Sequence, residues 1–494
     1  MKERLSDCNS RSEHAIHPGN PVFLLAVTAI SIQFYSLLRI KPFWLDEWFV
    51  IYSIKFLSYS DLFGILPFTQ QFPRCYLVLI KVISSISGYS YFGLRLLPFF
   101  IQILNVFLFF RISSLLFAGQ RKKQLAFILI ILSFFTTVHY FFQIKHYSAE
   151  MLASLLAFFQ YRFFCRIPDK SGINRHYLLW SLLFLILPLV SYTYAFTALP
   201  VFIFFFYPER RKISGILILP ACLFTAGLLI SWFTDLRMVL NDKTMNIYWE
   251  NFLIKTQSLK IFIKTALHSL INFFGLAAGQ NSENKNIFIL FGMHTAKLFF
   301  SITAVIGFSR PICAFFSKKS AVNRFNHDQI YFSGVIILIL AAGLAGKLPL
   351  GPMRLNYFAL PALAYFMISS GRTMRVFTRK KIAENFIIII IIVISSLFFI
   401  QRYVKEAFDK NQFFSRKSWE NAGNALKNAY RLNLPVFINS PAAEYDRLCL
   451  LAHPEFNIKN PRPIFITSKL SSPDLPGVYI SNWQINIKTS EIQK

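Results

Sequence analysis

Two adjacent acidic residues, Asp46 and Glu47, stand in the stretch Trp44-Leu45-Asp46-Glu47-Trp48, directly after the first long apolar segment. Adjacent carboxylates in a partly desolvated site raise one another's pKa, so one of them can act as a general base near neutral pH. Their oxygens are also ligands for a divalent cation. Alternatively, Asp46 is a helix N-cap that accepts bonds from the first N–H groups of a helix beginning at Glu47. Both interpretations stay open, because a capping Asp can also be catalytic.

A second cluster occupies residues 143–150, QIKHYSAE, between two apolar segments. Lys145 offers a point charge for a phosphate, and His146 and Tyr147 offer hydrogen bonds to a substrate. Glu150 falls just inside the next predicted helix, where an ionisable group is costly unless it is partnered. Snorkelling at the membrane surface is the alternative for Lys145, and an aromatic belt is the alternative for His146 and Tyr147.

A third cluster is the Gly- and Pro-containing stretch 347–357, KLPLGPMRLNY. The planar fork of Arg354 suits a phosphate or a carboxylate, and Tyr357 is a candidate for substrate contact. The alternative is that Arg354 anchors the end of a membrane span. Arg74 and Lys81, which follow the acidic pair in the same polar loop, are further candidates for anion binding.

The elements that must position these residues are membrane spans. The chain has 494 residues, 55% of them hydrophobic and 15% charged, with a mean hydropathy of +0.47. A soluble domain carries about 25% charged residues, and a span needs about 20 apolar ones. The formal net charge of +29 would suit nucleic acid. However, Lys and Arg recur in short loops between apolar segments, which indicates positive-inside topology and attraction to anionic lipid, with no nucleic-acid partner.

Hydropathy predicts eleven spans. Their approximate bounds are 21–40, 95–117, 124–142, 147–164, 177–191, 193–207, 214–233, 287–308, 329–346, 355–371 and 386–402. Pro188 and Pro200 interrupt the short pair 177–191 and 193–207, which leaves open whether these are two full spans or a partly re-entrant segment.

The basic loops after spans two, four, six, eight and ten fall on one side if the spans alternate, and the positive-inside rule makes that side cytoplasmic. The N-terminus is then cytoplasmic and the C-terminus external. The external face carries loops 41–94 and 234–286 and all three polar clusters. Because these clusters share one face, a functional interpretation is favoured over separate structural ones.

The predicted architecture is mainly α. A transmembrane domain, residues 1–402, has external juxtamembrane helices, a short one at 61–66 and an amphipathic one at 75–86 lying along the membrane surface. Residues 403–494 form a small external α/β domain, with a helix at 418–429 and strands at 435–438, 463–466 and 478–480.

Three patterns, in this order, resemble the GT-C class of polyprenyl-phosphate-sugar glycosyltransferases. More narrowly, they resemble the protein O-mannosyltransferase and lipid A aminoarabinose transferase superfamily. The patterns are Leu-Asp-Glu at 45–47, the progression through 72–80, 88–90 and 94–98, and 143–148. The resemblance covers residues 25–230, and beyond them it depends on topology, 354–357 and the C-terminal domain. Two departures are Lys145 where Arg is commoner, and 191–194, SYTY, where the family has a His-containing feature.

The resemblance implies that a sugar on a polyprenyl phosphate is transferred, with inversion, to a hydroxyl of a glycan, lipid or protein at the external face of a bacterial inner membrane. Asp46 would be the general base or would orient the acceptor. Glu47 would support Asp46 or bind a divalent cation. Lys145, Arg354 and Arg74 would hold the leaving phosphate. No resident cofactor is implied with certainty.

Two other functions remain open. A transporter or flippase of lipid-linked or anionic solutes would use broken helices near the midplane, for which Pro188, Pro200 and Glu150 are candidates. Few other ionisable groups fall in the middle of a predicted span, which counts against a transporter or flippase. A non-catalytic assembly protein of an envelope polysaccharide system would use residues 403–494 as its interaction module.

Overall fold

The computed structural model describes residues 21–39, 41, 43, 45–67, 70–165, 174–202, 214–241, 247, 249–278, 287–316, 327–378, 381–408, 436–439, 465–466, 477–481 and 484–488. Within residues 21–408 the described elements are helices. They are α2 (Pro21–Leu38), α3 (Leu45–Phe56), η2 (Asp61–Phe63), α4 (Arg74–Ile86), α5 (Tyr91–Leu116), α6 (Arg121–Leu132), α7 (Phe135–His139), α8 (Tyr147–Phe164), α9 (Arg175–Val190), α10 (Tyr194–Phe202), α11 (Ser214–Ser231), η6 (Trp232–Leu236), α12 (Arg237–Asn241), α14 (Leu259–Phe274), η7 (Leu276–Ala278), α15 (Ile287–Phe316), α16 (His327–Leu344), η9 (Tyr357–Ala359), α17 (Leu360–Thr378) and α18 (Lys381–Phe408).

Six helical segments in the described part of the chain are long and apolar enough to cross a membrane. They are Pro21–Leu38, Tyr91–Leu116, Ile216–Asn241, Leu290–Pro311, His327–Leu344 and Ile382–Phe408. These segments indicate an integral membrane protein. Shorter or more polar helices, α6, α8, α9, α10 and α17, lie at the other predicted spans. The count of eleven spans therefore stays a prediction.

One predicted span is not a continuous helix. The expected span 124–142 is broken, because α6 ends at Leu132 and the separate short helix α7 begins at Phe135. Phe134 between them has extended backbone angles, φ −65° and ψ 135°, which stop the helical hydrogen-bond ladder. The helix at the last predicted span, α18, continues past residue 402 to Phe408.

Loop 41–94 folds into α3, η2 and α4, so a short helix begins at Asp61 and a second helix covers the stretch predicted at 75–86. Helix α4 is amphipathic. Its buried face includes Tyr76, Leu77 and Ile80, whereas Val82 and Ile86 are exposed. An uncovered apolar stripe beside a polar loop is the pattern of a helix that lies in the membrane interface.

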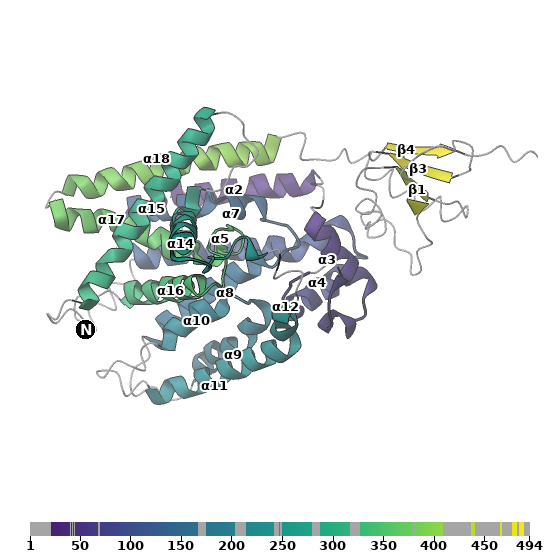
Figure 1. The fold of residues 1–494 in the computed structure, drawn as a ribbon, viewed down its shortest axis with the longest axis horizontal. Coiled ribbons are helices and arrows are strands. Elements are labelled where there is room, and N and C mark those ends of the chain that lie inside the picture. Colours follow the sequence, from purple (N-terminus) through teal and green to yellow (C-terminus); the bar gives the residue numbers. More distant parts are fainter. Residues whose placement is uncertain are drawn as a thin grey trace, which may run out of the picture. The chain divides into compact units, whose positions relative to one another are not determined.

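The chain divides into two compact units. Unit 1 contains the described residues within Met1–Gln33, Phe100–Phe141 and His146–Glu406, and unit 2 contains those within Phe34–Phe99, Phe142–Lys145 and Ala407–Lys494. In unit 1, α15 packs along α17 and α9 packs along α11 (Figure 1). A Cβ added at Gly307 of α15 would lie only 1.9 Å from the carbonyl oxygen of Phe366. The close approach of these two helices therefore requires glycine.

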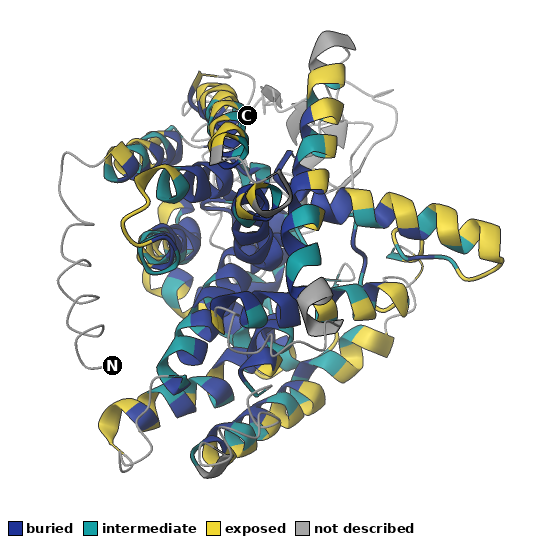
Figure 2. Cartoon of the chain, turned by 90° about the vertical axis from the view of Figure 1, so that its left-hand side faces the viewer, coloured by how far each residue is buried: buried dark blue, intermediate teal, exposed yellow. Residues whose placement is uncertain are grey.

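Phenylalanine and tyrosine rings fill much of the core of unit 1. Phe158 stacks on Phe332 with ring centroids 5.2 Å apart, and Tyr161 packs against Tyr331 at 4.5 Å. Exposed residues follow one side of several helices and buried residues follow the other (Figure 2). In a membrane protein, such apolar exposed stripes face lipid.

Four short strands form one sheet in the order β2-β1-β3-β4. They are β1 (Val436–Asn439), β2 (Phe465–Ile466), β3 (Gly477–Ser481) and β4 (Gln484–Lys488). β1 pairs in parallel with β2 and β3, and β3 pairs antiparallel with β4. β1, β2 and β3 lie at the three predicted strand positions. The helix expected at 418–429 lies outside the described residues, so the α/β domain at 403–494 stays a prediction.

Candidate active site

Asp46 and Glu47 lie in the first turn of α3, which begins at Leu45. The N-cap interpretation of Asp46 is therefore wrong, because this residue is already inside the helix. Carboxylates in a first turn interact favourably with the positive end of the helix dipole. Successive residues of a helix project about 100° apart, so the two carboxylates have different surroundings.

Glu47 is fully buried and pairs with an equally buried Arg95. Its Oε2 is 3.2 Å from the Nη2 of Arg95, and its Oε1 accepts a hydrogen bond of 2.9 Å from the backbone N–H of Ile144. Both carboxylate oxygens are therefore engaged within unit 2. The interaction joins α3, the start of α5 and the segment that carries Lys145.

Arg95 lies among aromatic rings. Its guanidinium carbon is 4.3 Å from the ring centroid of Phe43, 4.8 Å from that of Tyr91 and 5.1 Å from that of Phe142. Its Nη1 donates to the Tyr91 hydroxyl at 2.7 Å. A planar guanidinium both stacks on aromatic rings and pairs with a carboxylate, which an ammonium group does less well. The buried cation thus fixes the position of Glu47.

Asp46 is the more accessible carboxylate, with 28% of its side chain exposed. The Nζ of Lys145 lies 3.6 Å from its Oδ2. Lys145 also donates to the Oε1 of Gln70 at 3.3 Å and lies 5.8 Å from the ring centroid of Phe72. The Tyr76 hydroxyl donates to the carbonyl of Lys145 at 3.2 Å. The structure therefore places a partly exposed carboxylate beside a cation that is held from several sides.

The two other basic candidates of the first loop are buried. Lys81 donates from its Nζ to the carbonyls of Ile54 at 2.7 Å and Leu57 at 2.6 Å, at the end of α3. It caps that helix, so its predicted use as an anion contact is not supported. Arg74 is 2% exposed in the first turn of α4, and its phosphate contact stays a prediction.

His146 and Tyr147 open α8 in unit 1. The Nε2 of His146 lies 3.7 Å from the Oε1 of Glu150, one turn further along. The imidazole packs 4.8 Å from the ring of Tyr147 and 6.2 Å from the ring of Tyr192. The partner that Glu150 needed inside a helix is thus His146, and the predicted substrate contacts of His146 and Tyr147 stay predictions.

An acidic residue that the sequence analysis missed, Asp235, lies beside this cluster. The Tyr192 hydroxyl is 2.7 Å from each carboxylate oxygen of Asp235, which is 3% exposed. Asp235 lies in η6, a π-helical turn within the segment Ile216–Asn241. Such turns re-aim side chains and are frequent at functional sites. An Asp close to the end of an apolar span was the signal in the sequence.

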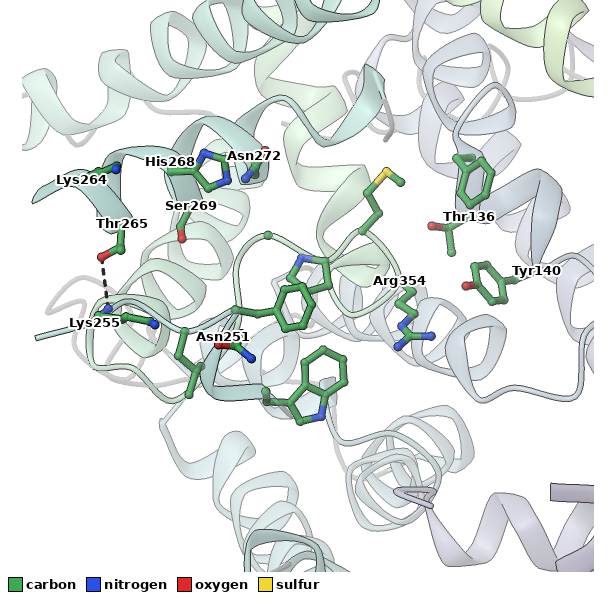
Figure 3. Close-up of a pocket in the computed structure, with 17 residues that line it drawn as sticks. Thr136, Tyr140, Asn251, Lys255, Lys264, Thr265, His268, Ser269, Asn272 and Arg354 are labelled. Atoms are coloured by element: carbon green, nitrogen blue, oxygen red, sulfur yellow. Dashed lines mark hydrogen bonds between the residues drawn. The ribbon is translucent and has the colours of Figure 1, made fainter. Parts of the chain in front are cut away.

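Arg354 borders a cavity of about 700 Å³ in unit 1. Its guanidinium carbon lies 5.8 Å from the ring centroid of Trp249. Asn356, fully buried, holds the loop that carries Arg354 by donating to the carbonyls of Pro349 at 2.9 Å and Pro352 at 3.1 Å. The cavity also contains basic and polar side chains from α14 and from the segment before it (Figure 3). From the sequence, this region was expected only to be part of the external loop 234–286.

Tyr357 is 2% exposed and is part of the core. Its hydroxyl oxygen accepts from the Nε2 of Gln102 at 2.9 Å and from the Oγ1 of Thr137 at 3.1 Å. Its ring stacks on Phe134 with centroids 5.7 Å apart. This burial favours a supporting role for Tyr357 over the predicted substrate contact.

The predicted site residues are divided between the two units. Unit 2 contains Asp46, Glu47, Arg74 and Lys145, and unit 1 contains His146, Tyr147, Arg354 and Tyr357. The structure brings Asp46 and Lys145 together, as expected. The expectation that Arg354 shares one site with them stays a prediction.

The acidic pair was also a candidate for a divalent cation. Both oxygens of Glu47 are engaged by Arg95 and Ile144, and Asp46 faces the ammonium group of Lys145. Within the described ranges, no group of three or more His, Cys, Asp and Glu side chains is placed to hold a metal ion. As arranged, the oxygens of the pair face cations and a backbone N–H, and cation binding by the pair stays a prediction.

No protein-family model matches the sequence, and no curated protein matches it either. Two solved structures, both of archaeal oligosaccharyltransferases, are similar to this chain. One is the oligosaccharyltransferase AglB from the archaeon Archaeoglobus fulgidus, in complex with an inhibitory peptide and a dolichol-phosphate. Its TM-score is 0.47 at 11% identity, over 88% of this chain and 63% of that one. The other is an oligosaccharyltransferase of the same organism in the apo form, with a TM-score of 0.43 at 11% identity, over 89% and 64%. This chain thus spans less than two thirds of the length of these chains.

Proposed function

We propose that this protein is a membrane glycosyltransferase that moves a sugar from a polyprenyl-phosphate donor to an acceptor hydroxyl. The observation that carries the proposal is the partly exposed carboxylate of Asp46, 3.6 Å from the ammonium group of Lys145, on a helix whose first turn is fixed by the buried Glu47–Arg95 pair. The ordered motifs of the sequence support the same class.

In the proposed reaction, Asp46 accepts the proton of the acceptor hydroxyl. The acceptor oxygen forms a bond to the anomeric carbon while the bond from that carbon to the phosphate oxygen breaks. The electron pair of the broken bond stays with the phosphate, so the leaving group is the polyprenyl phosphate. A fixed cation stabilises the negative charge that develops there, and Lys145 supplies one beside Asp46.

Glu47 acts in this proposal as a positioning residue. Its side chain is fully buried, so it does not meet a substrate. It holds the first turn of α3 against Arg95 and against the segment that leads into Lys145. A catalytic group needs such support, because small displacements of the reacting atoms cost rate.

The test uses the purified protein in lipid nanodiscs, supplied with polyprenyl-phosphate-linked sugars and with glycan, lipid and peptide acceptors. Mass spectrometry measures released polyprenyl phosphate and new glycosidic product. The proposal expects both to accumulate together. Flux of lipid-linked or anionic solute across proteoliposomes, with no glycosidic bond cleaved, would contradict it and favour a transporter.

A further inference from the structure

We propose that the cavity beside Arg354 binds an acidic saccharide, that is, a sugar unit that carries its own carboxylate or phosphate. The cavity has a volume of about 700 Å³, which lies within the range of about 300–1,000 Å³ that is common for small-molecule sites. A lone phosphate would occupy a small part of it. The inference rests on the proposed function and deepens it by naming the class of substrate.

Helix α14 presents a polar face to this cavity. Lys264, His268 and Asn272 recur every four residues, and Thr265 and Ser269 lie one position further along. Residues with this spacing share one helix face. The helix begins at a defined point, because the Ser258 side chain accepts from the N–H of Ile261. The face is therefore a fixed row of donors and acceptors.

The opposite face of α14 is apolar and uncovered. Leu259 is 75% exposed, Leu267 57% and Ile263 55%. In a membrane protein, a helix with one polar and one exposed apolar face suits the membrane interface. The polar row of α14 then borders the cavity from the surface at which lipid-linked substrates approach.

Positive groups stand at both ends of the cavity. Lys255 and Lys264 lie at one end, and Arg354 lies at the other, near Thr136 and Tyr140 (Figure 3). Among the described residues that line the cavity, none is acidic. Cations that are spread over a cavity of this size favour an extended anionic ligand over a single point charge.

Uncharged groups in the same cavity lining suit a sugar ring. Trp249 and Phe252 supply aromatic surface, and Asn251 and Asn272 supply amides. The Oδ1 of Asn272 accepts from the Nζ of Lys297. The NH₂ group of Asn272 therefore remains as a donor, and it lies on the side of Gly351, where a Cβ added to the glycine would be 3.9 Å from the Nδ2 of Asn272. Aromatic surface with a few placed polar groups is the usual lining of a site for a polar small molecule.

The test measures binding by calorimetry with the full chain in nanodiscs of zwitterionic lipid. The probes are glucuronic acid, glucose 6-phosphate, glucose and inorganic phosphate. We expect both acidic sugars to bind at least about tenfold more tightly than glucose and than inorganic phosphate, since one well-placed charged contact is worth about that factor. Equal affinities for glucose and the acidic sugars would overturn the inference. The inference would also be overturned if inorganic phosphate bound as tightly as glucose 6-phosphate. Loss of sugar binding when anionic lipid is added to the nanodiscs would overturn it as well.

Lys264 and Arg354 stand at opposite ends of the cavity, so the variant, Lys264→Gln or Arg354→Gln, at the end that holds the sugar's anionic group is expected to weaken binding of the acidic sugars about tenfold and to leave glucose binding unchanged. Unchanged binding of the acidic sugars in both variants would overturn the inference. The matched control is Lys260→Gln, on the same helix but not lining the cavity. A loss in the control as large as in the variants would also overturn the inference. Binding of acidic sugars without any transfer activity would defeat only the proposed function, whereas transfer of neutral sugars without such binding would defeat only this inference.

Discussion

At the residue scale, two adjacent carboxylates have different surroundings. Glu47 is buried in an ion pair with Arg95, and Asp46 is partly exposed beside Lys145. The sequence allowed both acids and Lys145 to be singled out, because charged residues at the edges of apolar segments are conspicuous. It did not show which acid is accessible. That depends on Arg95 and on the N–H of Ile144, which approach Glu47 only in the folded chain.

Breaking the buried Glu47–Arg95 pair is expected to lower the stability of the protein strongly. Glu47→Gln leaves the cation of Arg95 buried without its counter-charge, and breaking a buried pair in this way costs about 3–5 kcal/mol of unfolding free energy. Chemical unfolding in detergent micelles measures it. Asp61→Asn, at an exposed carboxylate elsewhere in the same loop, is the control. The amide oxygen of Asn can still accept from Ser58 as the carboxylate does, so stability should change by less than about 0.5 kcal/mol. Equal stabilities for Glu47→Gln and the wild type would contradict the pair's role.

Lys55 on α3 predicts a dependence of stability on pH. Burial lowers the pKa of Lys55 from 10.5 to about 8. The unfolded state therefore binds more protons between pH 8 and 10.5, so this group makes stability rise with pH in that window and lowers stability below it. Lys55→Met should be more stable than the wild type at pH 7, with the difference shrinking towards pH 10.5. Unfolding free energies of both proteins across this range provide the measurement, and a constant difference would contradict the prediction.

At the scale of elements, α3 is held at both ends. Its first turn is fixed through Glu47. At its other end, the carbonyls of Ile54 and Leu57 accept from Lys81, and the carbonyl of Ile54 also accepts from the Tyr89 hydroxyl at 3.3 Å. The amphipathic pattern of α4 could be predicted from its sequence. The role of Lys81 as a cap of α3 could not be predicted, because a cation in a polar loop gives the same sequence pattern whether it caps a distant helix or binds an anion. The break between α6 and α7 was also missed, since hydropathy is continuous across it.

Lys81→Met removes two charged hydrogen bonds from the end of α3. A bond to a charged group contributes about 1.5–3 kcal/mol, and the last turn of α3 should open more readily. Hydrogen exchange at the amides of residues 53–57 is expected to accelerate at least about tenfold, with little change in α14. Lys260→Met, an exposed lysine of α14, serves as the control. Unchanged exchange in α3 would show that Lys81 does not hold this end.

At the scale of the whole molecule, hydropathy alone predicted a polytopic helical chain, and six helices long enough to cross a membrane confirm that class. The length and composition of the apolar segments are sufficient to predict this class, because few soluble folds contain several apolar segments of about 20 residues. The division into two units was not predictable, since it depends on contacts between segments far apart in the sequence. The cavity was missed for the same reason, as α14 and the loop around Arg354 are separated by two long helices.

The predicted topology places Asp61 outside the cytoplasm and the basic residues 121–123 inside it. Asp61→Cys and Lys122→Cys, each in a background with the native cysteines replaced by Ser, test this with a membrane-impermeant maleimide. Asp61→Cys is expected to react in sealed cells, and Lys122→Cys only after permeabilisation. Labelling of both positions from the same side would contradict the topology and, with it, the external location of the acidic pair.

The most direct test of the central claim is the rate of sugar transfer by Asp46→Asn. General-base catalysis contributes about 10²–10⁴-fold to a rate, so kcat should fall by that factor. The free energy of unfolding should fall by only about 1 kcal/mol or less, because the side chain of Asp46 is partly exposed and lies 3.6 Å from Lys145. Asp61→Asn is the matched control and should transfer sugar at the wild-type rate. A wild-type kcat in Asp46→Asn would contradict the assignment of Asp46 as the catalytic carboxylate.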